Sequence, residues 1–317
     1  MLTRARKRLV VGLVALVALT GVTFAVAPQA KAAGSTEMVY SAAMNRNIPV
    51  RIIDGGGGGP KPTLYLLDGL LAPNNTSGWL QNTKVDQYMV GKGTNVAIPF
   101  GGAGSFYFDW NQRDPKLGLN KWETFLTREL PAYMKSKHNS DNRRNGIAGL
   151  SMSGTSALSI ASRHPNFYKA VASYSGYPTM SAPGFAQGIQ ASVARVGGNP
   201  NNMLGFYPSP RWFEVDPMLT AGNLAGKYVY VSSGTGMGSQ YDSSVTPGSP
   251  NFNPVKFSQM VPLEVAASAS SQLYIARLRT LPVKLTTNIT GPGTHWWTHW
   301  APNFERSWVT TFRPAFF

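Results

Sequence analysis

The sequence contains no cysteine among its 317 residues. This absence excludes a disulfide framework, a thiol nucleophile and any metal site built on thiolates. Stability must then come from packing of the core, which a chain of this length can supply. Acidic residues are also scarce, with 14 Asp and Glu against 29 Lys and Arg, and there are four histidines. We expect neither a bound metal nor another cofactor.

A long hydrophobic run occurs at the N-terminus. Four basic residues within the first eight precede the apolar segment 9–26, and "AKA" (30–32) supplies the small-x-small pattern of a signal-peptidase site. We interpret residues 1–32 as a secretory signal peptide and residues 33–317 as a single domain. A retained membrane anchor is the alternative, because an apolar run of this length can span a bilayer. The expected location is therefore secreted, at the cell envelope.

The remaining chain of about 285 residues is basic. The leader holds five of the basic residues and no acidic ones, which leaves 24 basic against 14 acidic residues and a net charge of about +10. The basic residues are scattered and no nucleic-acid-binding motif is present, so no nucleic acid partner is expected. For an exported protein the charge favours adhesion to an anionic envelope surface, and mere solubility is the plainer alternative.

Short apolar runs alternate with helix-like segments along this chain. Runs rich in Val, Ile, Leu or Tyr predict strands at 38–53 (one or two strands), 63–67, 95–100, 146–150, 168–174, 228–232 and 283–289. Amphipathic segments predict helices at 121–136, 155–164 and 263–281. The alternation predicts an α/β fold with a mostly parallel central sheet flanked by helices on both faces, and an antiparallel pair added at one edge. In such sheets chemistry collects at the carboxyl ends of the strands.

The stretch "GLSMSG" (149–154) lies between a predicted strand and a predicted helix. In a G-x-S-x-G turn the serine backbone is strained so that its hydroxyl stands free above the sheet. Here a small residue, Ser153, replaces the second glycine. We predict that Ser151 is a nucleophile, and the alternative is a plain helix cap.

A serine hydroxyl needs a general base within hydrogen-bond reach. His295 follows the last predicted strand, in "GPGTH" (291–295), where α/β-hydrolases place this base. His138, in a polar segment, and His164, at a helix end, are interpreted as structural. His299, four residues after His295, is the alternative base.

The base needs a carboxylate that fixes its tautomer. The chain order serine, acid, histidine leaves four candidates, Glu214, Asp216, Asp242 and Glu264. The residues alone do not choose among them, because Glu264 is also an ordinary acid for the first turn of a helix. The oxyanion hole would combine the amide of Met152 with an amide after the strand at 63–67, that of Leu70.

These motifs resemble the secreted mycolyltransferases of the antigen 85 type, an esterase branch of the α/β-hydrolase superfamily in actinobacteria with a mycolic-acid envelope. The matching segments, in the family's order, are "YLLDGL" (65–70), "GGAGSFYFDW" (101–110), "KWETFLTREL" (121–130), "GLSMSG" (149–154), "LE" (263–264) and "GTHWW" (293–297). They extend over most of the chain after the leader, so the resemblance is specific.

The resemblance implies an α/β-hydrolase fold and a serine acyltransferase. The enzyme would move a mycolyl group between trehalose esters, or onto arabinogalactan, through an acyl-serine intermediate. It would use a glycolipid acyl donor and a sugar acceptor. The site residues carried over are the nucleophile Ser151, the base His295, the acid Glu264, the oxyanion amides of Leu70 and Met152, and a sugar-hydroxyl contact at Asp68.

Two positions depart from the family pattern. Leu71 stands where the family has an arginine that contacts trehalose, and Leu80 stands where it has an aspartate. The family's disulfide is missing as well. These departures leave the acceptor sugar open and slightly favour the first alternative, a secreted carboxylesterase.

A second alternative is a non-catalytic envelope- or matrix-binding protein, because one branch of the family has lost its catalytic residues. A surface that stacks on sugars or lines the acyl chain would come from an aromatic set, although most aromatics in such a fold belong to the core. Its candidates are Phe106, Tyr107, Trp110, Trp296, Trp297 and Trp300.

Overall fold

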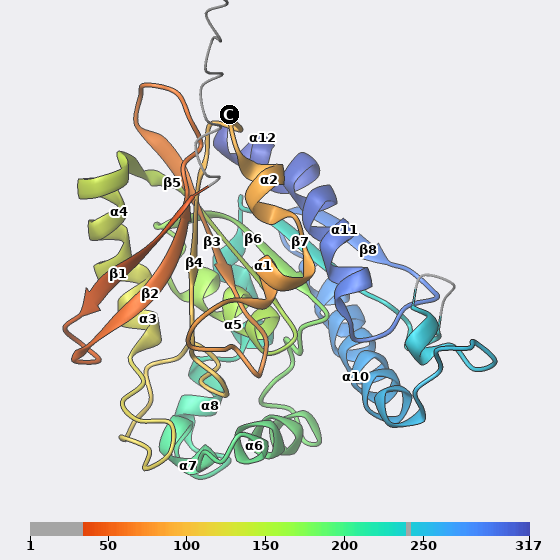
Figure 1. Cartoon of the computed structure of the whole chain (residues 1–317). Coiled ribbons are helices and arrows are strands. Elements are labelled where there is room, and N and C mark those ends of the chain that lie inside the picture. Colours follow the sequence, from red (N-terminus) through yellow and green to blue (C-terminus); the bar gives the residue numbers. More distant parts are fainter. Residues whose placement is uncertain (1–33, 239–241) are drawn as a thin grey trace, which may run out of the picture. The chain divides into compact units, whose positions relative to one another are not determined.

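The computed structural model describes residues 34–238 and 242–317 (Figure 1). An eight-stranded sheet forms the centre of this part of the chain. The predicted signal peptide, residues 1–32, lies outside them. The strands are β1 (Ser35–Ser41), β2 (Arg46–Ile53), β3 (Lys61–Leu67), β4 (Asn95–Pro99), β5 (Ser140–Leu150), β6 (Tyr168–Tyr174), β7 (Tyr228–Ser233) and β8 (Lys284–Ile289). Their order across the sheet is β1-β2-β4-β3-β5-β6-β7-β8.

The sheet is parallel from β4 to β8, and β1 and β2 form an antiparallel pair at its edge. Every residue of β3 and β4 is buried. Continuous apolar runs of this kind are what a parallel strand covered on both faces requires. The predicted fold class, including the antiparallel edge pair, is confirmed.

Helices cover both faces of the sheet. They are α1 (Gly78–Asn82), α2 (Val85–Met89), α3 (Trp122–Thr124), α4 (Leu130–His138), α5 (Met152–Arg163), α6 (Phe185–Arg195), α7 (Pro200–Leu204), α8 (Pro210–Glu214), α9 (Pro217–Thr220), α10 (Pro254–Leu278), α11 (Trp297–Ser307) and α12 (Arg313–Phe316). Shorter turns are η1 (Phe125–Glu129), η2 (Ala221–Leu224), η3 (Ser243–Val245) and η4 (Trp308–Phe312), of which η1 and η4 are π-helical.

The alternation of side chains along β3 divides the core into two layers. Leu64 and Leu66 pack with α1, α2, α11, η4 and α12. Tyr65 and Leu67 point to the other face, where they pack with α3, η1, α4, α5 and α10. Period-two alternation of a strand buried on both faces therefore gives each helical layer its own apolar surface.

The sequence predicted three helical regions and missed the others. The predicted helix at 121–136 corresponds to α3, η1 and α4, the one at 155–164 to α5, and the one at 263–281 to α10. α10 begins earlier, where the Asn253 side chain caps the amide of Lys256. α6 was missed although its buried residues Ala186, Ile189 and Val193 recur at helical spacing. A glycine at each of positions 184 and 188 lowers the intrinsic helix propensity of this segment. Within the two described ranges, no helix has both the length and the hydropathy needed to cross a membrane.

Helices α6, α7 and α8 lie together beyond one end of the sheet in Figure 1. At the carboxyl ends of the central strands, the chain continues into Asp68 after β3, Ser151 after β5 and Ser175 after β6. The carboxyl ends of parallel strands all lie at the same end of the sheet. The topology therefore brings polar residues from distant parts of the sequence together at this end.

We predict that Phe312→Ala destabilises the protein strongly. Phe312 is fully buried in the layer on the α11 side, and its ring lies against Gly146 of β5. Truncation would leave a cavity and should lower the free energy of unfolding by about 3–5 kcal/mol. The matched control is Phe317→Ala, because Phe317 is 68% exposed and should cost about 0.5 kcal/mol or less. Urea denaturation followed by circular dichroism measures the free energy of unfolding of both variants. Equal decreases in the two variants would contradict this packing.

Candidate active site

Ser151 occupies the sharp turn between β5 and α5. Its backbone has φ 54° and ψ −120°, a strained conformation for a residue other than glycine. The turn needs Gly149, because a Cβ there would overlap the Ser153 carbonyl group. The Ser151 side chain does not cap α5. Its hydroxyl is thus directed away from the helix and is available to a partner outside it.

The Ser153 hydroxyl ties together the ends of two central strands. Its Oγ accepts the amide hydrogen of Leu150 at 2.9 Å and lies 3.0 Å from the carbonyl oxygen of Leu67, to which it donates. Leu150 ends β5 and Leu67 ends β3. A serine in place of the second glycine therefore adds a bond that holds the turn against the neighbouring strand.

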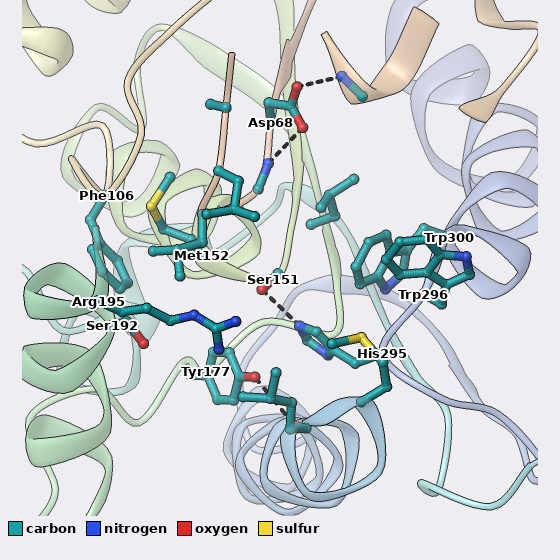
Figure 2. Close-up of a pocket in the computed structure, with 18 of the residues that line it drawn as sticks. Asp68, Phe106, Ser151, Met152, Tyr177, Ser192, Arg195, His295, Trp296 and Trp300 are labelled. Carbon is teal, nitrogen blue, oxygen red and sulfur yellow. Dashed lines mark hydrogen bonds between the residues drawn. The ribbon is translucent and has the colours of Figure 1, made fainter. Parts of the chain in front are cut away.

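Ser151, His295 and Glu264 form a continuous chain of hydrogen bonds. His295 Nε2 lies 2.7 Å from Ser151 Oγ (Figure 2), and His295 Nδ1 lies 2.7 Å from Glu264 Oε2. His295 follows β8 in the loop before α11, and Glu264 lies within α10. Both are buried, with 4% and 0% of their surface exposed. The structure thus brings together three side chains in the arrangement that serine hydrolases use.

The Glu264 carboxylate is surrounded by donors. Besides His295, the Ser175 hydroxyl donates to Oε1 at 2.8 Å and the Gly234 amide donates to the same oxygen. Trp300 Nε1 donates in turn to Ser175 Oγ at 2.9 Å. Burial alone would raise the pKa of Glu264, but these hydrogen bonds and the charge of protonated His295 outweigh burial, and the pKa is lowered. The carboxylate is therefore ionised at neutral pH.

The other three histidines have partners outside this chain of bonds. His138 and His164 each lie against a glutamate, with Nε2 at 3.0 and 2.7 Å from the carboxylate. His299, the alternative base, lies with Nε2 3.1 Å from the carbonyl oxygen of Pro292. Its ring fills the space beside Gly293, where a Cβ would collide with it. His299 thus braces the loop that carries His295.

The three other candidate acids also have local roles. Asp216 caps α9, and Glu214 pairs with an arginine of α8 at 3.1 Å. Asp242 accepts the hydroxyl hydrogen of Thr294 at 3.0 Å, next to His295 in the chain. Of the four acids considered, only Glu264 contacts the His295 ring within the described residues.

The amides of Leu70 and Met152 lie at the edge where the oxyanion hole was expected. Leu70 is in the loop after β3, and Met152 is the first residue of α5, where helix amides lack an intrahelical partner. Neither amide has an acceptor among the residues that the structure describes. Both residues line the same pocket as Ser151, so two free donors are available near its hydroxyl.

Asp68 holds the loop that carries Leu70. Its carboxylate accepts the amide hydrogens of Gly69 at 2.8 Å and Gly78 at 2.6 Å, and the Ser77 hydroxyl at 2.9 Å. Burial raises the pKa of Asp68, although these three hydrogen bonds act in the opposite direction. Figure 2 shows Asp68 at the pocket with two of these bonds. The carboxylate thus joins the end of β3 to the start of α1, and its contact with a sugar hydroxyl stays a prediction.

A pocket of about 650 Å³ surrounds Ser151. Figure 2 shows Trp296 and Trp300 on one side of Ser151, and Phe106, Ser192 and Arg195 on the other. Other lining residues on the loops and helices around it include Asp68, Leu71, Gln81, Asn82, Tyr177, Ile189, Met260, Leu263 and Ala266. The pocket therefore has an aromatic side near His295 and a side built by α6.

The two positions that depart from the family pattern differ in their environment. Leu71 lines the pocket and is 68% exposed. Leu80 is not among the pocket residues, and packs instead against the core layer under α1, α2 and α11.

The six aromatic candidates also divide between the pocket and the core. Phe106, Trp296, Trp297 and Trp300 line the pocket, whereas Tyr107 and Trp110 are fully buried core.

Sequence reasoning missed several residues of the site. Ser175 follows a predicted strand, so the rule that chemistry collects at carboxyl ends was the available signal. Ser192 and Arg195 lie on α6, which was not predicted at all, so nothing pointed to them. Gly234 acts through its backbone amide, which no side chain reveals.

We predict that Ser175→Ala moves the acid limb of the pH profile of kcat/KM to higher pH. The Ser175 hydroxyl is one of the donors that lower the pKa of Glu264, so its loss raises that pKa and the carboxylate becomes protonated at higher pH. The control is Ser258→Ala, which removes a hydroxyl of α10 that donates to the Val255 carbonyl oxygen and leaves the Glu264 donors intact. An acid limb that moves equally in both variants would contradict this role.

Comparisons with known proteins identify the family. A family model described as "Putative esterase" matches residues 41–309. The diacylglycerol acyltransferase/mycolyltransferase Ag85A of Mycobacterium ulcerans is 36% identical over 248 residues, which cover 73% of this chain and 73% of that protein. Ag85B of Mycobacterium leprae (strain TN) is 32% identical over 268 residues, which cover 83% of this chain and 78% of that protein.

Solved structures agree with these sequence relatives. Mycobacterium tuberculosis MPT51 (FbpC1) superposes with a TM-score of 0.75 at 26% identity, covering 88% of this chain and 98% of that one. An S-formylglutathione hydrolase from Agrobacterium tumefaciens shares the fold, with a TM-score of 0.63 at 16% identity over 88% of this chain and 96% of that one. The chain belongs to the esterase family defined by this model and, within it, to the Ag85 diacylglycerol acyltransferases/mycolyltransferases.

Proposed function

We propose that this protein is a serine acyltransferase that moves a mycolyl or similar long-chain acyl group from a glycolipid ester to a sugar hydroxyl. The observation that carries the proposal is the hydrogen-bond chain from Ser151 through His295 to the ionised Glu264, at the wall of a pocket. Family membership supplies the reaction class, because the relatives are named diacylglycerol acyltransferases and mycolyltransferases.

The first half-reaction forms an acyl-serine. His295 Nε2 takes the hydroxyl proton of Ser151 as Oγ bonds to the ester carbonyl carbon, and Glu264 stabilises the imidazolium. The amides of Leu70 and Met152 donate to the carbonyl oxygen as it becomes negatively charged. The bond to the alcohol oxygen then breaks, and the alcohol leaves with the proton from His295.

The second half-reaction reverses these steps with a new alcohol. An acceptor hydroxyl gives its proton to His295 Nε2 and attacks the acyl carbon, and the Ser151 Oγ leaves with that proton returned to it. Transfer exceeds hydrolysis only where the acceptor is held better than water. The acceptor must therefore bind where His295 can reach its oxygen.

The side of the pocket near His295 suits a sugar. The indole of Trp296 lies there, and Asp68, Gln81 and Asn82 add carboxylate and amide groups to the lining. Sugars bind by hydrogen bonding of their hydroxyls and by stacking on aromatic rings. Lys256 Nζ lies 4.0 Å from the centre of the Trp296 ring and fixes its orientation. We infer that the acceptor sugar, trehalose or arabinogalactan, occupies this side.

The site of action follows from the leader and the charge. Residues 1–32 have the pattern of a cleaved secretory signal, and the remaining chain carries a net charge of about +10. A basic enzyme would be held near an anionic envelope surface. We place the reaction at the cell envelope, outside the cytoplasmic membrane.

We predict that the purified protein converts trehalose monomycolate into trehalose dimycolate with release of trehalose, as lipid analysis would show. The result follows from our proposal that the pocket side near His295 holds a second sugar. Free mycolic acid as the sole product would show that the protein is a carboxylesterase and not a transferase. An absence of turnover would favour a binding protein.

We predict that a serine-reactive organophosphorus probe labels the wild type and that Ser151→Ala abolishes the labelling. The control is Ser258→Ala, which removes a hydroxyl on α10 that, among the described residues, donates to the Val255 carbonyl oxygen of its own helix. Glu264→Gln should lower kcat by about 10³–10⁴-fold, since the amide stabilises the wrong histidine tautomer and carries no charge. Labelling of Ser151→Ala at the wild-type rate would refute the assignment of the nucleophile.

A further inference from the structure

Helix α6 presents one face to the pocket, and that face ends in a charge. Phe185, Gly188, Ile189, Ser192 and Arg195 line the pocket at the three- and four-residue spacing of one helix face. Phe185 and Ile189 are apolar, and Gly188 has no side chain. Ser192 donates its hydroxyl hydrogen to Gly188 in the helix itself, so Arg195 is the polar group that α6 offers to a ligand.

Arg195 differs from the other ionisable residues that line the pocket. Asp68 accepts three hydrogen bonds, and His295 is bonded on both ring nitrogens. Arg195 forms no hydrogen bond or ion pair with any residue in 34–238 or 242–317. A guanidinium is always charged and presents a planar set of donors, so an unpaired one facing a partly apolar pocket has its strongest partner in an anionic oxygen group.

The reaction geometry decides which part of a substrate this guanidinium meets. The leaving oxygen must receive its proton from His295 Nε2, so the alcohol part lies on the side of His295, Trp296 and Trp300. The acyl part extends from the carbonyl carbon in the opposite direction. In Figure 2 Arg195 lies across Ser151 from these tryptophans, and its guanidinium points into the pocket. Arg195 is therefore on the acyl side.

We propose that Arg195 binds an anionic oxygen group, a carboxylate or a phosphate, carried by the acyl part of the ester. This inference rests on the proposed acyl transfer at Ser151 and adds a second class of donor, because a mycolyl chain itself carries no anion. An apolar neighbour on the same helix face, Ile189, still accommodates the hydrocarbon between the ester and the anion.

The test compares three p-nitrophenyl-type esters that differ in where the charge lies. They are p-nitrophenyl hexanoate, the mono-p-nitrophenyl ester of adipic acid, and 3-carboxy-4-nitrophenyl hexanoate. The first is neutral, the second carries a carboxylate at the end of the acyl chain, and the third carries it on the leaving group. The readout is the ratio of kcat/KM for each anionic ester to kcat/KM for the neutral ester.

We expect Arg195→Gln to lower the ratio for the adipate ester about tenfold, as for a partly exposed charge-assisted hydrogen bond. Arg195→Glu should lower it further, and Arg195→Lys should retain part of it. Added salt should lower the wild-type ratio. Arg279→Gln, at the exposed end of α10, removes the same charge outside the pocket and is the control. An unchanged ratio in Arg195→Gln, an equal drop in Arg279→Gln, or an effect confined to the leaving-group carboxylate would overturn the proposal.

A second measurement separates this proposal from the proposed function. If the wild type hydrolyses none of the esters, acyl transfer at Ser151 fails, but binding can still be measured. Calorimetry with monomethyl adipate, using Ser151→Ala and the double variant Ser151→Ala/Arg195→Gln, then reports on Arg195 alone. Binding about tenfold weaker in the double variant supports the anion site, and equal affinity refutes it.

Discussion

Glu264 loses its water when α10 packs over the sheet, and a buried carboxylate stays ionised only if other donors replace that water. Three donors do so, and each comes from a different element: His295 from the loop after β8, Ser175 from the end of β6, and Gly234 from the end of β7. Because one carboxylate joins all three, the position of the His295 ring depends on the packing of α10 and on the register of two strands. Ser151 meets that ring only when the whole edge is assembled.

Most of the sheet was predictable from the sequence, and less of the surrounding structure was. The strand that leads to Ser151 ends in a buried apolar run, so its length and flanking residues identify it and place Ser151 at its end. The strand before His295 mixes leucine and isoleucine with threonine, lysine and asparagine, so its signal is weaker. α6 was missed although its buried residues recur at helical spacing, because the glycines in and before the segment pointed to a loop. The amides of Leu70 and Met152 were expected from the serine turn and from the loop after the strand at 63–67, and only weakly, because a backbone donor leaves no mark on side-chain identity. The choice of Glu264 among four acids likewise needed the family pattern, since burial by α10 is a tertiary property.

The pocket divides along the bond that the proposed reaction breaks. His295 must face the alcohol oxygen, so the alcohol and the acyl chain are assigned to opposite sides of Ser151. Asp68 contributes indirectly on the alcohol side: its carboxylate fixes the loop that presents the Leu70 amide and the start of α1. The same side chain therefore couples the loop of Leu70 to the start of α1.

The distribution of charge around Ser151 is unusual for a chain with an excess of basic residues. Leu71 places an exposed hydrocarbon at the pocket where the family pattern has a cation, whereas α6 places an unpaired cation on the opposite side. Leucine cannot donate a hydrogen bond to a sugar hydroxyl, so recognition of the sugar at this position loses a charge-assisted hydrogen bond. A hydrocarbon chain gains nothing from the guanidinium of Arg195, because a guanidinium gives up hydration without compensation when it is covered by an apolar group. If Arg195 binds an anionic acyl group as proposed, the same chemistry at Ser151 extends to esters whose charge lies on the acyl part.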